Sequence, residues 1–329
     1  MDLYFLHHDE FKSHYNCSMM SDEEWGTKGS PNVLIGSICL AMGVVCLFLY
    51  IPCIVVMRQP ELFKHSCYKM MVALGIIDCF SVVYNCIFGG YFSLVGAVAC
   101  PHIVFHYFVG ASSVAVWSAQ CLMCILLAVN RCSDLWNVPI LQRAFEGKHV
   151  YGVIALPLIY GLCVLWFGQG CMFSSNGNAY FFDPYIFISD VKVDRSYYTG
   201  YLLSFNNTTA AISLSSLHAF LLASVYWKSR GASTSNLTKM QRQLFVQAFA
   251  VCSLNFMAAS LYVLMQYVNV PYAVILTAEF TWQGATGGAV FIYLILNRTI
   301  RRGILSLLFG LKLQKIHHVI TPSYSRTSR

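Results

Sequence analysis

The chain has 329 residues, of which 57% are apolar and 11% are charged. Soluble domains carry about 25% charged residues, so this composition argues against a water-soluble globular protein. The mean hydropathy of +0.59 points the same way. The low charge also argues against a disordered chain and, despite a formal net charge of +7, against a nucleic-acid-binding protein, because phosphate binding requires clustered exposed Lys and Arg.

The first 32 residues are polar and contain no apolar stretch that would make a cleavable signal peptide. Seven apolar segments follow, each at or above the ~20 residues that an α-helix needs to cross a bilayer. Backbone groups in lipid must be hydrogen-bonded within their own segment, so we predict an all-α seven-transmembrane bundle. The predicted spans are Val33–Met57, Cys67–Phe92, Pro101–Arg131, Tyr151–Phe173, Gly200–Trp227, Leu244–Val268 and Pro271–Leu296.

The distribution of basic residues predicts the orientation of this bundle. With the amino terminus outside, the outer segments contain only four of the 21 Lys and Arg residues, namely Lys12, Lys28, Lys192 and Arg195. Basic flanking residues stay on the cytosolic side during insertion. The sequence therefore predicts an N-terminus outside and a C-terminus inside.

This topology divides the chain into an extracellular segment (1–32), the bundle (33–296), a juxtamembrane helix (297–311) and a cytoplasmic tail (312–329). The juxtamembrane segment places Leu and Ile at helical spacing beside Arg301 and Arg302, which is typical of an amphipathic helix on anionic membrane lipid. Asn16-Cys17-Ser18 is a glycosylation sequon on the predicted outer side, so Asn16 is a candidate glycosylation site.

Most of the fourteen cysteines lie singly in apolar runs, where cysteine acts as a small apolar side chain. We find no zinc-ribbon spacing. His102 and His106 are four residues apart on one helical face, but a membrane desaturase or hydroxylase needs several histidine pairs, and the other two, His7-His8 and His317-His318, lie on opposite sides of the membrane. No metal and no cofactor are therefore predicted. The spans contain no lysine for a retinal Schiff base, and HExxH, P-loop and nucleophile-elbow motifs are missing, so we do not expect an enzyme.

Polar and aromatic residues gather near the predicted outer ends of the third, sixth and seventh spans. A mostly apolar cleft with a few placed polar groups is typical of small-molecule sites, whereas packing between helices remains an alternative for each residue. Asp78 lies in the middle of the second span, where a carboxylate is costly and faces the bundle interior. The candidate ligand-binding residues are His102, Phe105, His106, Tyr262, Gln266, Glu279, Trp282 and Gln283.

Several motifs, in this order, resemble the nematode serpentine receptor class T (Srt) chemoreceptors, a divergent branch of the rhodopsin-like G-protein-coupled receptors. The resemblance covers most of the chain. The motifs are Leu49-Tyr50-Ile51-Pro52-Cys53, Tyr68-Lys69-Met70-Met71 leading to Leu74-Gly75-Ile76-Ile77-Asp78, Leu127-Ala128-Val129-Asn130-Arg131-Cys132-Ser133-Asp134-Leu135-Trp136, Phe181-Phe182-Asp183-Pro184, the segment from Ala258 to Gln266, Trp282-Gln283, and the segment from Ile292 to Arg301.

The resemblance implies a receptor for an environmental small molecule that acts through a heterotrimeric G protein, in the plasma membrane and sensory cilia of chemosensory neurons. Arg131 would hold the inner helix ends together at rest and meet the G protein when they part, and Asp78 would lie in a water and sodium pocket. The predicted G-protein coupling residues are Asn130, Arg131, Lys228, Arg230, Lys239 and Arg242. Asn130 replaces the usual switch aspartate, Cys132 replaces its tyrosine, and the sixth and seventh spans lack an internal proline.

Seven-helix receptors often have a disulfide at the position of Cys100. The outer loop from Ser174 to Thr199 contains no cysteine, so the partner would be Cys171 or Cys17, and a free Cys100 also stays open.

A ligand-gated channel or a transporter is the alternative function. The charge distribution opposes the inverted topology of insect odorant-receptor channels, and no repeated halves of the transporter kind are detected.

Overall fold

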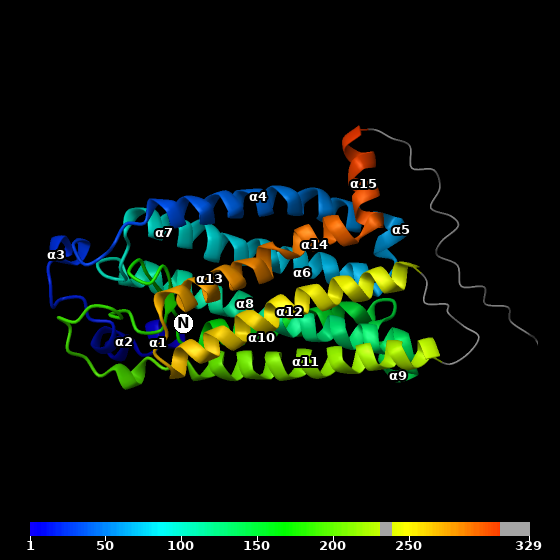
Figure 1. The fold of residues 1–329 in the computed structure, drawn as a ribbon. Helices are drawn as coiled ribbons and strands as arrows, with labels where there is room; N and C mark the ends of the chain where they lie inside the picture. The colour runs from blue at the N-terminus through cyan, green and yellow to red at the C-terminus, as the bar shows by residue number, and fades with distance from the viewer. Residues whose placement is uncertain (231–238, 310–329) are drawn as a thin grey trace, which may run out of the picture.

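The computed structural model describes residues 1–230 and 239–309. Within them, seven helical stretches run side by side along the long axis of the molecule, as predicted (Figure 1). In chain order they are α4 (Val33–Met57), α6 (Ser66–Val82) continued by the π-helical η1 (Val83–Phe88) and α7 (Gly89–Val95), α8 (Ile103–Trp136), α10 (His149–Phe167), α11 (Tyr201–Arg230), α12 (Lys239–Tyr267), and α13 (Tyr272–Gly287) with α14 (Ala289–Leu296).

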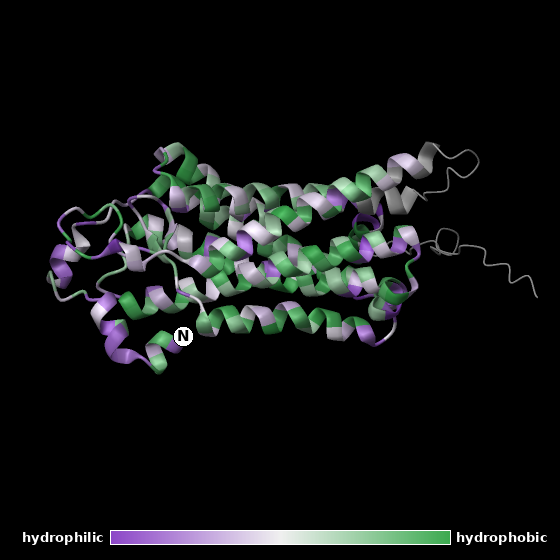
Figure 2. Cartoon of the chain, turned by 90° about the horizontal axis from the view of Figure 1, so that it is seen from below, coloured by the Kyte–Doolittle hydropathy of each residue, from purple (hydrophilic) through white to green (hydrophobic). Residues whose placement is uncertain are grey.

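Apolar residues cover the middle of the bundle and hydrophilic residues gather at its two ends (Figure 2). By length and composition, five of the described helices are able to cross a membrane: Val33–Met57, Ser66–Val95, Ile103–Trp136, His149–Phe167 and Phe249–Tyr267. The seventh stretch is divided at Gly288, so neither α13 nor α14 has the length of a span on its own.

Local interruptions shape three of the helices. Pro52 lies within α4 and Pro157 within α10, and each removes a backbone donor from the helical ladder. The second stretch contains the wide turn Val83–Phe88, a π-segment of the kind often found at functional sites. The seventh stretch breaks at adjacent glycines, Gly287 and Gly288, rather than at a proline.

The two ends of the bundle carry different short elements. At one end, here called the disulfide end, lie α1 (Asp2–Phe5), α2 (His8–His14), α3 (Asp22–Gly26), the 3-10 turn η2 (Arg195–Tyr197) and a hairpin of β1 (Met172–Ser174) and β2 (Ala179–Phe181) (Figure 1). The hairpin is antiparallel, with Phe173 opposite Tyr180. At the other end, here called the α15 end, lie α5 (Pro60–Phe63), α9 (Pro139–Phe145) and α15 (Arg298–Phe309).

The fourth span ends earlier than predicted. The sequence stays apolar to Phe173, but the helix stops at Phe167 because Gly168 adopts an extended backbone. The chain then turns inward, and a side chain at Gly110 of α8 would overlap the carbonyl of Cys171. Close backbone packing of this kind requires glycine, and it brings the hairpin into the mouth of the bundle.

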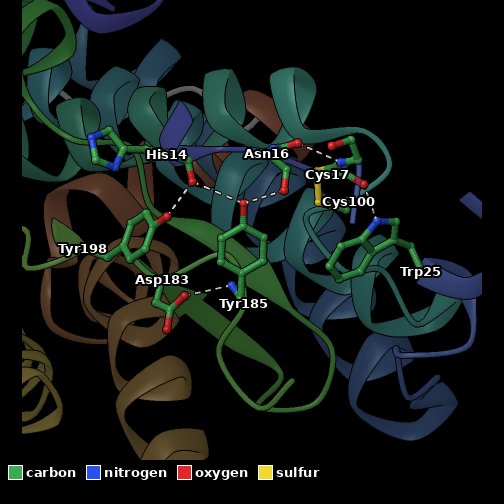
Figure 3. The surroundings of a disulfide bond; sticks show 9 residues. His14, Asn16, Cys17, Trp25, Cys100, Asp183, Tyr185 and Tyr198 are labelled. Carbon is green, nitrogen blue, oxygen red and sulfur yellow. Dashed lines mark hydrogen bonds between the residues drawn. A yellow bond between two sulfur atoms is a disulfide. The ribbon is translucent and has the colours of Figure 1, made fainter. Parts of the chain in front are cut away.

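The structure excludes Cys171 as the partner of Cys100. Cys100 forms a disulfide with Cys17, the other candidate, with a Cα–Cα distance of 5.8 Å (Figure 3). Cys171 is a buried thiol whose Sγ lies 3.5 Å from Ser113 Oγ and 3.6 Å from the Gly110 carbonyl. Cys171 points into the bundle against α8, whereas Cys100 precedes that helix and meets the N-terminal segment.

Candidate functional site: a cavity beneath the disulfide end

The N-terminal segment packs on the loop between α10 and α11 and forms a cap over the disulfide end. The Tyr185 hydroxyl lies 2.9 Å from the Asn16 carbonyl, and the Tyr198 hydroxyl donates to the His14 carbonyl at 2.5 Å (Figure 3). Trp25 Nε1 donates to the carbonyl of Cys17 at 2.8 Å. Trp25 is 1% exposed and belongs to the same apolar core as Phe92 and Tyr107 of the bundle, so the cap packs continuously on the helices.

Two ion pairs hold the cap together. Lys28 pairs with Asp190 at 2.5 Å, which joins the N-terminal segment to the loop. The hydrogen bond and positive charge from Lys28 lower the pKa of the Asp190 carboxyl. Arg195 pairs with Asp183 at 2.5 Å and also donates to the carbonyls of Tyr185 and Ile188, so the loop is crossed by a network centred on one guanidinium.

A cavity of about 340 Å³ lies beneath this cap, a size within the range of small-molecule sites. Helix α8 forms one wall, α11, α12 and α13 form the others, and the hairpin and loop close the top. The lining residues are Ser113, Val114, Trp117, Cys171, Tyr180, Phe181, Phe182, Asp183, Ile186, Arg195, Tyr198, Thr199, Tyr201, Leu203, Asn207, Tyr262, Met265, Gln266, Tyr267 and Trp282.

Trp282 stands at the centre of an aromatic cluster on the cavity wall. Its ring centroid lies 6.2 Å from that of Trp117, 5.7 Å from Tyr180 and 5.7 Å from Tyr262, and all three pairs are edge-to-face. Trp117 Nε1 donates to Asn207 Oδ1 at 2.8 Å, which fixes the orientation of its indole. Edge-to-face pairs contribute about 0.5–1.5 kcal/mol each beyond their buried area, so this wall is rigid.

A buried carboxylate lies directly behind the wall. Glu279, which is 2% exposed, accepts a hydrogen bond from the Tyr262 hydroxyl at 2.7 Å and another from Gln283 Nε2 at 3.0 Å. Within residues 1–230 and 239–309, no Lys, Arg or His makes an ion pair with Glu279. An ionisable residue in this setting is a functional-site candidate, because burial without a counter-charge is costly.

A second polar cluster lies deeper in the bundle. The hydroxyl of Tyr50 lies 2.8 Å from Asp78 Oδ2 and 2.7 Å from the carbonyl of Thr286, where the seventh helix is about to break. Asn85, in the π-segment of the second stretch, donates to Thr286 Oγ1 at 3.0 Å. Several buried atoms of this cluster have no hydrogen-bond partner in the described part of the chain: Asp78 Oδ1, Ser81 Oγ, Asn85 Oδ1 and Gln283 Oε1.

At the α15 end, Arg131 lies at the inner face of α8. Its guanidinium contacts the Sγ of Cys67 at the start of α6, and Nη1 lies 3.9 Å from Asp134 one turn further along α8. The side chain is only 11% exposed. Arg131 also lines a cavity of about 30 Å³ with Gln247 of α12 and Tyr293 of α14, so three helices meet at this point.

Comparison with known proteins decides the family. The model of the family described as "Serpentine type 7TM GPCR chemoreceptor Srt" matches residues 1–318. The chain belongs to the Srt family. It is therefore a membrane receptor of the G-protein-coupled class, and membership of this family implies a receptor role rather than an enzymatic one.

A relative and a solved structure agree with this assignment. The Srt chain is 24% identical to Serpentine receptor class T-55 of Caenorhabditis elegans over 299 residues, which is 89% of this chain and 80% of the relative. It superimposes on the crystal structure of squid rhodopsin with a TM-score of 0.60 at 13% identity, covering 88% of this chain and 87% of that one. The second similarity shows that the Srt bundle has the rhodopsin fold.

Five of the eight predicted ligand-binding residues of this Srt receptor lie at the cavity or directly behind its wall. Tyr262, Gln266 and Trp282 line the cavity. Glu279 and Gln283 are buried behind them, and Gln283 Nε2 also lies 3.3 Å from the Asn85 carbonyl and so reaches the deeper cluster.

The three residues predicted from α8 and its start do not line the cavity. His102 is exposed and Phe105 is 48% exposed. His106 is buried, but its ring stacks on Phe92 with centroids 4.4 Å apart. Phe105 and His106 both contact Phe92 of α7, whereas the cavity begins further along α8 at Ser113.

Sequence reasoning missed several residues that shape the Srt cavity. Trp117 and Asn207 are large or polar side chains in the middle of apolar helices, and this unusual position was a signal that pointed to the bundle interior. Asp183 and Arg195 are loop residues, and their pairing across the cavity mouth follows only from the fold of the cap. Tyr180 enters through the unpredicted hairpin.

The predicted coupling residues lie partly outside the described residues. Asn130 is buried at 1% exposure, and Arg131 meets Cys67 as described above. The side chains of Lys228 and Arg230 near the end of α11, and of Lys239 and Arg242 at the start of α12, lie outside the described part of the structure, as do residues 231–238 and 310–329.

Proposed function

We propose that this Srt receptor is a chemosensory G-protein-coupled receptor that binds an environmental small molecule in the cavity at the disulfide end and activates a heterotrimeric G protein at the α15 end. The observation that carries the proposal is the cavity of about 340 Å³ enclosed by four bundle helices and the cap. A ligand with different affinities for two arrangements of these helices shifts their equilibrium. Two of these helices, α8 and α12, also line the small cavity beside Arg131.

In this proposal the disulfide end faces the outside of the cell. The excess of Lys and Arg in segments at the α15 end supports this orientation, as does the disulfide, because disulfides persist in oxidising compartments. Asn16 is exposed beside the disulfide, so it would carry the N-linked glycan. Plasma-membrane and ciliary localisation follows from the chemosensory role and is tested by epitope tagging of both termini in unpermeabilised sensory neurons.

Helix α15 would lie on the inner leaflet of the membrane. Its exposed apolar residues are Leu305, Leu307, Leu308 and Phe309, with Arg301 and Arg302 exposed near its start. An apolar face beside cations is the pattern of an interfacial helix on anionic lipid.

The deeper cluster around Asp78 would hold water or a sodium ion. Tyr50 has one hydroxyl proton but two acceptors within hydrogen-bond distance, and Asp78 Oδ1 has no partner within the described ranges. Buried polar atoms without partners are the usual environment of ordered water or ions. Because Tyr50 also contacts Thr286 near the break at Gly288, occupancy of the cluster would couple the second and seventh helices.

G-protein activation with Arg131→Ala tests the proposal. The assay first uses a ligand screen in cells that coexpress promiscuous G proteins, with calcium or cyclic nucleotide as the readout. We expect Arg131→Ala to abolish the ligand response at equal surface expression, and Arg58→Ala, an exposed arginine at the end of α4, to preserve it. Unchanged signalling by Arg131→Ala would exclude Arg131 from coupling, and an extracellular C-terminus would exclude the proposed orientation.

A further inference from the structure

We infer that the ligand of the cavity carries a positive charge, as a protonated or quaternary amine attached to an apolar body. This inference rests on the proposed function in one respect, namely that the cavity is the ligand site. It adds the chemical class of the ligand, which neither the family nor the fold specifies. Three features of the cavity support it: its charge balance, its aromatic wall and the position of Glu279.

The charge balance of the cavity is negative. Asp183 lines the mouth of the cavity. Glu279 lies behind the wall and is hydrogen-bonded to Tyr262, which lines the cavity. Among the lining residues, all of which the structure describes, Arg195 carries the positive charge. Its guanidinium is already bound to Asp183 and to two loop carbonyls, so it compensates the charge of Asp183 and does not compensate that of Glu279.

Glu279 is held toward the cavity by the residues that form the wall. Its Oε2 accepts from the hydroxyl of Tyr262, whose side chain lines the cavity, and Trp282 follows Glu279 by three residues on the same face of α13. In a low-dielectric interior a charge acts over this short distance much more strongly than it does in water. A cation in the cavity would therefore supply the missing counter-charge for the buried carboxylate.

The aromatic wall favours the same ligand class. The rings of Trp117, Tyr180 and Tyr262 surround Trp282, each with its centroid 5.7–6.2 Å from that of Trp282. Electron-rich rings attract ammonium groups, and tryptophan does so most strongly. Proteins often bind quaternary ammonium ligands in cages of aromatic side chains. A carboxylate beside such a cage increases the preference for a positively charged ligand. The apolar remainder of the cavity would hold the uncharged body of the ligand.

The test uses pairs of probes that have the same shape but differ in charge. Phenethylamine is compared with 2-phenylethanol, and choline with 3,3-dimethylbutan-1-ol, on the purified full-length receptor in lipid nanodiscs. Trp117 and Trp282 line the cavity, so binding is read as a saturable change in tryptophan fluorescence. We expect the charged member of each pair to half-saturate the signal at a concentration at least about tenfold lower, a ratio equivalent to ~1.4 kcal/mol.

Substitution of Glu279 separates the role of its charge from that of its shape. We expect Glu279→Gln to reduce the ratio of the two half-saturating concentrations to about twofold or less. The variant should weaken binding of the amine and leave binding of the alcohol unchanged. Glu23→Gln, an exposed acid in α3, is the matched control and should keep the full ratio. If Glu279→Gln fails to fold, Trp282→Leu removes the central ring of the aromatic wall, and it should reduce the ratio by weakening the binding of the amine more than that of the alcohol, with Trp117 left as the fluorescent reporter.

Three outcomes would overturn the inference. They are equal binding of the amine and the alcohol, a preference that survives Glu279→Gln, and a preference that survives Trp282→Leu. Failure of both amines to bind at millimolar concentration also counts against it. The measurement contains no G protein, so a negative result leaves the proposed signalling function intact, and a receptor that fails to signal can still show the charge preference.

Discussion

Asn297 Nδ2 lies 3.2 Å from Gln247 Oε1, so the residue that begins α15 is hydrogen-bonded to the sixth bundle helix. Both side chains are buried, and Gln247 also reaches the Sδ of Met71 in α6 at 3.9 Å. Arg131 is engaged with Cys67 at the same level of the bundle. The sixth helix is therefore linked to the seventh helix and to α6 through the amide of Gln247.

Loss of this amide bond should raise signalling in the absence of ligand. Asn297→Asp removes the Nδ2 donor but keeps the oxygen that accepts from the backbone N–H groups of Thr299 and Ile300. One hydrogen bond contributes about 0.5–1.5 kcal/mol, so we expect basal G-protein activation to rise by a factor of about 2–12. Nucleotide exchange on membranes with equal receptor content measures this rise.

Asn297→Ala provides the comparison, because it removes both the link to Gln247 and the cap of α15. Basal activity should rise as it does in Asn297→Asp, and the thermal stability should fall further, by about 1 kcal/mol for the lost cap. If Asn297→Asp has wild-type basal activity while Gln247→Met also does, the amide link does not restrain the sixth helix.

The bundle was predictable because its physical cause is local. A run of about 20 apolar residues has few alternatives to a membrane helix, so all seven stretches were found. The error at the fourth span shows the limit of hydropathy. Met172 and Phe173 are as apolar as the helix before them, but Gly168 ends the helix and the chain enters the mouth of the bundle as a strand. Hydropathy does not distinguish burial in lipid from burial in protein.

The site was only partly predictable because it depends on helical phase and on contacts distant in sequence. Glu279, Trp282 and Gln283 were found since polar residues within an apolar span face the interior. Phe105 and His106 were placed at the correct end of α8 but too close to its start, because their rings meet Phe92 of α7 and the cavity begins two turns further along at Ser113. The Cys17–Cys100 disulfide spans 83 residues, and nothing local to either cysteine specifies it.

The disulfide should be tested by three serine substitutions. Cys17→Ser and Cys100→Ser each remove the same bond, so we expect equal losses of stability and no further loss in the double variant. Removing a disulfide costs about 2–5 kcal/mol in small domains, and the loss here should fall at or below the lower end because the bundle helices remain inserted. Thermal unfolding of the purified receptor measures the loss.

Cys171→Ser is the matched control for that series. Cys171 is a thiol against Ser113 and Gly110, so the change should lower stability by less than either disulfide variant. Additive losses from Cys17→Ser and Cys100→Ser, or an equal loss from Cys171→Ser, would contradict the observed pairing.

Alanine substitution at two glycines of the bundle helices should have different effects on stability, with a loss at Gly110 and no loss at Gly152. A Cβ at Gly110 would overlap the backbone carbonyl of Cys171, so Gly110→Ala must displace the turn that carries the hairpin. We expect a loss of about 1–3 kcal/mol and a reduced yield of folded receptor. Gly152 in α10 is exposed, and a methyl group added there would meet nothing within 4 Å, so Gly152→Ala should be neutral or stabilising by up to about 1 kcal/mol.

Size-exclusion chromatography of fluorescently tagged variants compares the two yields under one set of conditions. Equal yields for Gly110→Ala and Gly152→Ala would show that the turn at Cys171 moves without cost. That result would also remove the structural reason for the early end of the fourth helix.

The contribution of Tyr185 to the cap should disappear at alkaline pH. Its hydroxyl lies against the carbonyls of His14 and Asn16, and burial raises its pKa from the usual 10 to about 12. A group whose pKa is higher in the folded state contributes stability below its unfolded pKa and loses that contribution as the pH rises through the folded value. The phenolate also has no proton to donate to either carbonyl. Below pH 10, Tyr185→Phe should therefore be less stable than the wild type by about 1 kcal/mol.

The difference in stability between the wild type and Tyr185→Phe should narrow steadily between pH 10 and pH 12. The wild type loses the contribution of the Tyr185 hydroxyl in this range, and the variant lacks that hydroxyl at every pH. Thermal unfolding midpoints of the purified receptor across this range measure it. Tyr15 and Tyr198 also have pKa values raised by burial, so both proteins lose stability together and only the difference reports on Tyr185. Tyr91→Phe, at a tyrosine of α7 that is 53% exposed, should show no such trend. A constant difference across the range would mean that the Tyr185 ring, and not its hydroxyl, supports the cap.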